Sequence, residues 1–167
     1  MKLYHFSDNP DIQRFEPRMI YEETEAKVWA IDVFHAPHYF FPRECPRVCV
    51  WPEEYTTEAD LNLFFCMSTT QRIIAIESAW YDQVSKGHIY RYSFNPDDFV
   101  LHEPNAGYYI SSVSVVPSNV ERIDDLIGSI TDLGIEFRVT PSLKPLKDLV
   151  LKSSLNYSMI RLRNAVM

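Results

Sequence analysis

A histidine stands in the middle of the first apolar stretch of the chain, LYHFS, with an aromatic residue on each side. If this stretch is a β-strand, its period of two residues puts His5 and Ser7 on the same face. An imidazole and a hydroxyl on one face can hydrogen-bond the hydroxyls of a ribose. The alternative is a core histidine packed between sheet aromatics, and these five residues by themselves leave both interpretations open.

Two more aromatic residues follow in the next two apolar segments. Trp29 lies in VWAID, and Tyr39 lies in HAPHYFF. The flat ring of either residue can stack on a nicotinamide or a nucleobase. A histidine on a strand, with such a ring nearby, can therefore clamp a nucleotide, with a core histidine between sheet aromatics as the alternative.

Two histidines and two cysteines lie within fifteen residues in HAPHYFFPRECPRVC. Imidazoles and thiolates are the usual zinc ligands, so His35, His38, Cys45 and Cys49 are a candidate structural zinc site. The spacing argues against zinc, because strong signatures use C-x2-C pairs and these cysteines are C-x3-C with a proline between them. Cys49 also lies inside the apolar run VCVW, which is typical of a small core residue. We therefore expect no metal, with zinc as the alternative.

Arginines beside prolines are candidates for binding phosphate. Arg18, Arg43 and Arg47 stand next to or close to prolines, and an arginine on a rigid loop can hold a phosphate with two parallel hydrogen bonds. If His5 holds a ribose, Arg18 or Arg43 is the expected partner of the pyrophosphate. Ion pairs with the many acidic residues are the alternative for all three arginines.

The composition limits the class of protein. A chain of 167 residues, 46% of them hydrophobic, is long enough for one domain with its own core over residues 1–167. The net charge of −7 argues against general nucleic-acid binding, which needs a basic face. We find no apolar run typical of a signal peptide or a membrane span, and three cysteines are an odd number for a disulfide framework. We expect a cytoplasmic protein with reduced thiols and no membrane binding.

Strands and helices are mixed without regular βαβ alternation, which predicts the α+β class. Alternating or β-branched runs predict strands, and periodic runs with capping residues or a following glycine predict helices. Strands are expected at residues 3–6, 28–32, 48–51, 72–76, 88–94, 99–102, 108–116 and 135–139. Helical segments are expected at residues 11–15, 35–41 (helical or irregular), 57–67, 79–85, 123–133, 146–151 and 158–163.

LYHFS, VWAID and the following stretch with Ala36 and Tyr39 resemble the opening of ADP-ribosyltransferase-like domains. In that family an early strand carries a histidine motif, and a later strand carries an aromatic residue before a helix with Ala and Tyr. The resemblance implies a single α+β domain of two small, mostly antiparallel sheets flanked by helices. It also implies NAD as the cofactor, with His5 on its ribose, Ser7 beside it, and Trp29 or Tyr39 packed on its nicotinamide.

The third signature of that family is a glutamate near a strand start, and the equivalent stretch here is Gly107–Ser111, GYYIS. Tyr108 stands at the position of the glutamate, and a phenol with a pKa of about 10 supplies no carboxylate at neutral pH. Glu103, five residues upstream, is the candidate replacement. Glu103 and Tyr108 are therefore the catalytic candidates for ADP-ribosyl transfer or NAD cleavage, with the acceptor not indicated.

The leading expectation is a protein that binds NAD or a related nucleotide as a small-molecule ligand. The rival is a non-catalytic nucleotide sensor, or a protein-interaction module, that kept the fold and lost the acid. Over nearly its full length the chain also resembles a family of small uncharacterised bacterial proteins with the pattern LYHFS, WAID, HAPHYFFPR, CPRV and TPSL. That second resemblance implies no activity.

Overall fold

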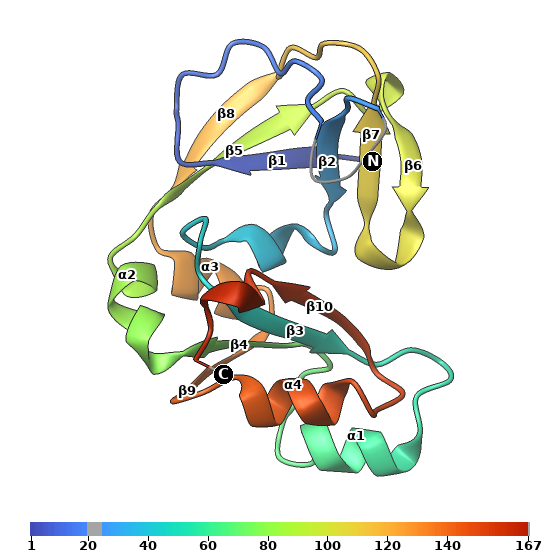
Figure 1. The fold of residues 1–167 in the computed structure, drawn as a ribbon, viewed down its shortest axis with the longest axis vertical. Helices are drawn as coiled ribbons and strands as arrows, with labels where there is room; N and C mark the ends of the chain where they lie inside the picture. Colours follow the sequence, from blue (N-terminus) through green and yellow to red (C-terminus); the bar gives the residue numbers. More distant parts are fainter. Residues whose placement is uncertain (20–24, 167) are drawn as a thin grey trace. The chain divides into compact units, whose positions relative to one another are not determined.

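The structure of the protein is a computed structural model that describes residues 1–19 and 25–166. Contacts divide the chain into two compact units, each built around its own sheet (Figure 1). Unit 1 comprises Met1–Phe40 and His88–Asp124, and unit 2 comprises Phe41–Gly87 and the residues from Asp125 onward. The predicted α+β class and the two mostly antiparallel sheets are confirmed, whereas one domain over the whole chain stays a prediction.

Within the described residues, the sheet of unit 1 has six strands in the order β6-β7-β2-β1-β5-β8, and neighbouring strands are antiparallel. Alternate side chains of these strands pack on one face with Phe15, Phe99 and Val115 to form a hydrophobic core. The strands are β1 (Leu3–Ser7), β2 (Val28–Asp32), β5 (Ile89–Phe94), β6 (Val100–Glu103), β7 (Tyr108–Ser111) and β8 (Asn119–Ile123). The 3-10 helices between them are η1 (Ala36–Tyr39), η3 (Pro96–Asp98) and η4 (Pro104–Ala106).

In the described part of unit 2, four strands form a sheet in the order β10-β3-β4-β9, in which the β4–β9 pair is parallel and the other pairs are antiparallel. Every residue of the central strands β3 and β4 is buried, as expected of strands covered on both faces. The strands are β3 (Arg47–Trp51), β4 (Ile73–Glu77), β9 (Glu136–Thr140) and β10 (Asn156–Ile160). The helices are α1 (Glu58–Phe65), η2 (Ser78–Trp80), α2 (Tyr81–Ser85), α3 (Leu126–Thr131), α4 (Lys144–Val150) and η5 (Leu162–Asn164).

Side-chain hydrogen bonds mark the starts of α1, which lies within the predicted segment 57–67, and of α3, which starts three residues later than predicted. The hydroxyl of Thr57 accepts a hydrogen bond from the backbone N–H of Asp60 at 3.2 Å, before α1. A carboxylate oxygen of Asp125 accepts one from the N–H of Gly128 at 2.9 Å, before α3. Such residues stabilise a helix because its first N–H groups have no partner within the helix.

Two predicted helical segments are wrong, and two strands, β8 and β10, were not expected. Residues 11–15 form no helical turn, because the N–H of Ile12 donates to the hydroxyl of Tyr92 and Phe15 forms a β-bridge with Val115. Residues 158–163 contain the end of β10, which pairs with β3, and then η5. Strand β8 occupies residues 119–123 ahead of α3. In residues 11–15 and 158–160, contacts with distant segments outweigh a weak local preference for helix.

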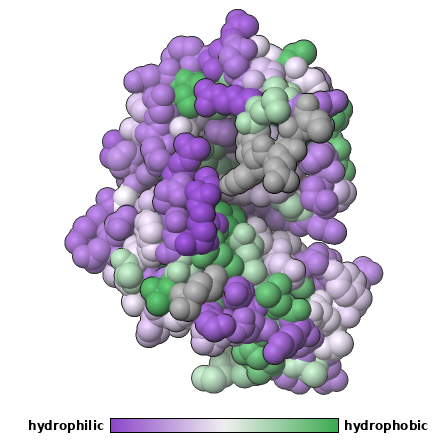
Figure 2. All heavy atoms as spheres, in the orientation of Figure 1, coloured by the Kyte–Doolittle hydropathy of each residue, from purple (hydrophilic) through white to green (hydrophobic). Residues whose placement is uncertain are grey.

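Charged residues make up 23% of the chain. The face shown in Figure 2 is mostly hydrophilic, with hydrophobic residues in small groups. No helix within residues 1–19 and 25–166 has the length and the apolar character needed to cross a membrane.

Candidate functional site

The candidate site lies in unit 1, where strands β1 and β2 separate. The two strands pair at Leu3 with Asp32 and at Tyr4 with Ile31. Beyond that point β1 stays paired with β5 as far as Ser7, and β2 stays paired with β7. The two backbones therefore fork, and a cavity of about 120 Å³ opens at the fork.

The fork explains why residues from both faces of β1 reach one cavity. Three consecutive residues of each strand line the opening, and η1 and the start of β7 add one tyrosine each. The described lining residues are Tyr4, His5, Phe6, Trp29, Ala30, Ile31, Tyr39 and Tyr108. The lining contains three tyrosines, one phenylalanine, one tryptophan and one histidine. Side chains of this kind can stack on a flat ring.

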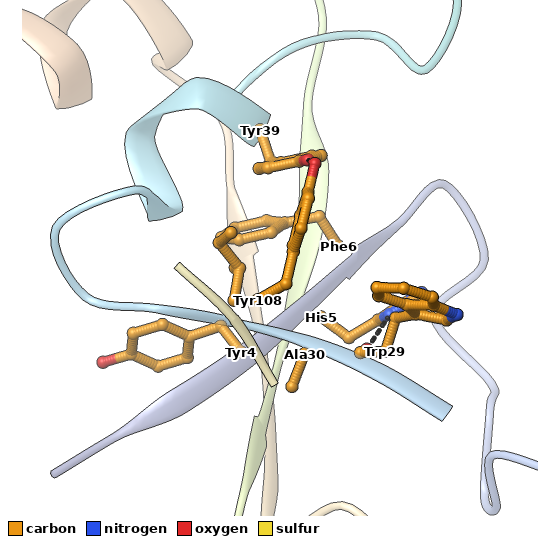
Figure 3. Close-up of a pocket in the computed structure, with 8 residues that line it drawn as sticks. Tyr4, His5, Phe6, Trp29, Ala30, Tyr39 and Tyr108 are labelled. Carbon is orange, nitrogen blue, oxygen red and sulfur yellow. Dashed lines mark hydrogen bonds between the residues drawn. The ribbon is translucent and has the colours of Figure 1, made fainter. Parts of the chain in front are cut away.

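His5 bridges the two arms of the fork. Its Nδ1 lies 3.0 Å from the backbone oxygen of Trp29 (Figure 3). Because a carbonyl oxygen only accepts, Nδ1 carries the proton, and a neutral ring then has its lone pair on Nε2. The same ring packs against Phe15, with the ring centres 4.8 Å apart. His5 is thus both part of the aromatic packing of the sheet and a lining residue of the cavity.

The hydroxyl oxygens of Tyr39 and Tyr108 lie 2.6 Å apart beside Phe6 (Figure 3). The ring of Tyr39 is nearly parallel to that of Phe6, at 10° and 6.1 Å between centres. The ring of Trp29 meets that of Tyr108 edge to face, at 87° and 5.6 Å. Each aromatic wall is therefore held in place by a neighbouring ring.

A turn at Gly107 positions Tyr108. Gly107 has a φ of +68°, a conformation that favours glycine, and its carbonyl accepts the N–H of Asp32 at 3.0 Å. The carboxylate of Asp32 accepts hydrogen bonds from the backbone N–H and the Nδ1 of His35, both at 2.8 Å. Burial by itself would raise the pKa of Asp32, but these hydrogen bonds outweigh it and hold the pKa below its ordinary value of 3.8. An ionised Asp32 thus ties β2 to the segment that begins η1.

Four of the residues that the sequence singles out line the same cavity. They are His5, Trp29, Tyr39 and Tyr108, which come from β1, β2, η1 and β7. The buried indole N–H of Trp29 has no hydrogen-bond acceptor among the residues that the structure describes. The cavity therefore unites segments that lie far apart in the sequence.

Ser7 and Glu103 lie outside the described lining. Ser7 follows His5 on the same face of β1, but its hydroxyl accepts the backbone N–H of Asn9 at 3.1 Å. Glu103 is exposed and stands opposite Tyr108 in the pairing of β6 with β7. Its carboxylate accepts the N–H of Asn105 at 3.3 Å.

The two arginines expected at a pyrophosphate also lie outside the described lining. Arg18 has an exposed side chain, and its backbone forms an isolated bridge with Lys27. Arg43 is exposed and belongs to unit 2.

The residues of the zinc alternative are buried. His35 is bound to Asp32 in unit 1, whereas Cys45 and Cys49 belong to unit 2. Burial raises the pKa of both thiols to about 12, although Arg47 acts in the opposite direction. Among residues 1–19 and 25–166 we find no group of three or more His, Cys, Asp or Glu side chains that could hold a metal ion.

Sequence reasoning did not identify four of the lining residues. They are Tyr4, Phe6, Ala30 and Ile31, of which the first three are direct neighbours of His5 or Trp29 in the chain and the last follows Ala30. The alternation of LYHFS indicates that Tyr4 and Phe6 share a face. It contains no signal for the fork, because the separation of β1 from β2 depends on how each pairs with a third strand.

Comparison with known proteins places the chain in a family but assigns it no activity. Neither a curated protein nor a solved structure matches the chain. A family model described as "Family of unknown function (DUF6886)" matches residues 4–165 and so covers the candidate site completely. The protein therefore belongs to the DUF6886 family.

Proposed function

We propose that unit 1 binds NAD or a related nucleotide and that one flat ring of the ligand enters the cavity at the fork. The observation that carries this proposal is the convergence of His5, Trp29, Tyr39 and Tyr108 on one cavity. The resemblance of LYHFS and VWAID to ADP-ribosyltransferase-like domains names the same region of the chain. A mostly aromatic cavity with a few polar atoms is the usual form of a site for a heterocycle.

The size of the cavity selects one ring rather than a whole dinucleotide. Its volume is about 120 Å³. An apolar cavity of about 150 Å³ holds one benzene molecule, and sites for whole drug-sized ligands measure about 300–1,000 Å³. The cavity therefore has room for no more than one ring; in this proposal the ring is the nicotinamide or the nucleobase, and the ribose and phosphates lie outside the cavity.

Polar atoms at the wall suit a heterocycle better than a plain hydrocarbon. The hydroxyls of Tyr39 and Tyr108, joined by one hydrogen bond, place two polar oxygen atoms at the wall of the cavity. His5 adds an imidazole held in one tautomer by the carbonyl of Trp29. Stacking on the rings then supplies affinity, and these polar groups supply orientation.

The residues that line the cavity support a binding role better than a catalytic one. Among the described lining residues, none is Asp or Glu. Tyr108 shares a hydrogen bond with Tyr39, and its phenol supplies no carboxylate. A nucleotide sensor is therefore the function we assign, and ADP-ribosyl transfer is the second candidate because Glu103 stands opposite Tyr108 across the β6–β7 pair.

The test of binding is a thermal-shift titration with NAD and ADP-ribose on the wild-type protein, His5→Ala and His88→Ala. A ligand at about a hundred times its Kd stabilises the native state by about 2.7 kcal/mol. We expect this stabilisation in the wild type and in His88→Ala, whose exposed imidazole lies outside the described lining, and its loss in His5→Ala. No shift in the wild type at millimolar ligand would overturn the proposal.

The second candidate is tested by release of nicotinamide from NAD. A sensor releases no nicotinamide above the background rate, either as the wild type or as Glu103→Gln. Turnover that disappears in Glu103→Gln and persists in Glu54→Gln, at an exposed residue of unit 2, would assign the reaction to the acid opposite Tyr108. That result would replace the sensor by an enzyme.

A further inference from the structure

An arginine lies on the same face of the unit 1 sheet as the aromatic wall of the cavity. In the pairing of β1 with β5, Arg91 stands directly opposite Phe6. Cross-strand partners project from the same face, so Arg91 shares the face of Tyr4 and Phe6. Strand β8 contains Arg122, but that residue stands opposite Tyr90, the chain neighbour of Arg91, and so projects from the other face. Among the described strands of this sheet, Arg91 is the only arginine or lysine on the cavity face.

The guanidinium of Arg91 packs on a lining residue. Its central carbon lies 4.9 Å from the ring centre of Tyr4. One Nη donates to the carboxylate of Glu121 at 2.6 Å, and the buried Nε–H has no acceptor among the described residues. The side chain is 25% exposed. Arg91 is thus positioned by Tyr4, partly removed from water, and able to donate more hydrogen bonds than it does.

The partner of Arg91 is easily displaced. Glu121 stands opposite Arg91 on β8, which is an edge strand, and its side chain is 50% exposed. Ion pairs of such exposure add little to stability, whereas a phosphate offers two parallel charge-assisted hydrogen bonds to a guanidinium. A phosphate that reaches Arg91 can therefore replace Glu121.

We propose that Arg91 binds the phosphate of a nucleotide whose ring occupies the cavity, and that Glu121 occupies the guanidinium until the ligand arrives. This inference rests on the proposed function. It gives the phosphate a cation, whereas Arg18 and Arg43 lie outside the described lining of the cavity. Because the protein carries a net charge of −7, an anionic ligand needs such a local cation. The ligand class is a nucleoside phosphate, and the corresponding nucleoside is a weaker ligand.

The test compares two pairs of probes that differ in the phosphate alone: AMP with adenosine, and nicotinamide mononucleotide with nicotinamide riboside. Dissociation constants are measured by calorimetry for the wild type, Arg91→Gln, Glu121→Gln and Arg122→Gln. Arg122 is the matched control, because it is an ion-paired arginine on the same sheet that projects from the other face.

We expect the wild type to bind the phosphorylated member of a pair about tenfold tighter, and Arg91→Gln to bind both members equally. Glu121→Gln tightens binding of the phosphorylated probe alone, and Arg122→Gln leaves the ratio unchanged. Equal affinities in the wild type, or no effect of Glu121→Gln in a folded protein, would overturn the role of Arg91 and leave the cavity proposal standing. If the wild type binds no probe at all, the proposed function fails and this inference fails with it.

Discussion

The hydroxyl oxygens of Tyr39 and Tyr108 lie 2.6 Å apart although the residues are 69 positions apart in the chain. This hydrogen bond joins the 3-10 helix η1 to the start of strand β7. It closes the wall of the cavity on the side of Phe6, on which Tyr39 stacks. The bond therefore links the shape of the candidate site to the stability of unit 1.

Removing either hydroxyl of this pair is expected to cost about 1 kcal/mol of unfolding free energy, because one partly buried hydrogen bond is lost. Tyr39→Phe, Tyr108→Phe and the double variant are compared by urea unfolding. The double variant should cost less than the sum of the two single variants, since both remove the same bond. Tyr81→Phe, at an exposed tyrosine of unit 2, is the control and should leave stability unchanged. Strict additivity would contradict the coupling.

Gly107→Ala is expected to be strongly destabilising. The φ of +68° costs an L-residue about 1–2 kcal/mol, and a Cβ would lie 2.1 Å from Nδ1 of His35 and 2.7 Å from a carboxylate oxygen of Asp32. Gly134→Ala is the matched control, with a φ of +71° and no atom within 4 Å of its Cβ. Thermal unfolding should show a clearly larger loss for Gly107→Ala. Equal losses would mean that backbone strain alone matters at both positions.

Acid should remove the stabilisation that Asp32 provides. Its pKa in the folded state lies below the ordinary value of 3.8, so the ionised carboxylate stabilises the fold above that pH, and the effect is lost as the pH falls through the folded-state pKa. At pH 6 we expect Asp32→Asn to be less stable than the wild type by about 1 kcal/mol, because a charged acceptor is replaced by a neutral one. Urea unfolding at pH 6 and pH 3 checks this. A gap of the same size at both values would show that the charge of Asp32 is irrelevant.

The three cysteines should differ sharply in reactivity. Burial raises the pKa of Cys45 and Cys49 to about 12, so their thiolate fraction at pH 8 is very small, whereas Cys66 is exposed. Ellman's reagent should therefore modify one thiol rapidly in the native protein and all three after denaturation. The rapid phase should disappear in Cys66→Ser. A fast second thiol would contradict the burial of Cys45 or Cys49.

Local sequence signals determined many of the elements. The apolar run VWAID is β2 over the predicted residues, and the hydroxyl and acid of Thr57 and Asp60 mark the start of α1. These signals depend on contacts within a few residues, so they can be read from the chain itself. The same locality explains why His5, Trp29 and Tyr39 could be selected as binding candidates.

Long-range pairing decided the remainder. Asn156–Ile160 is a strand because β3 supplies hydrogen-bond partners for its backbone, and no nearby residue indicates that pairing. The same holds for the fork of β1 and β2, for the contact of Tyr39 with Tyr108, and for Arg91 on the ring of Tyr4. The residue types of the candidate site are thus a property of the sequence. Their convergence on one cavity is a property of the tertiary structure alone, because it depends on strand partners that lie far apart in the chain.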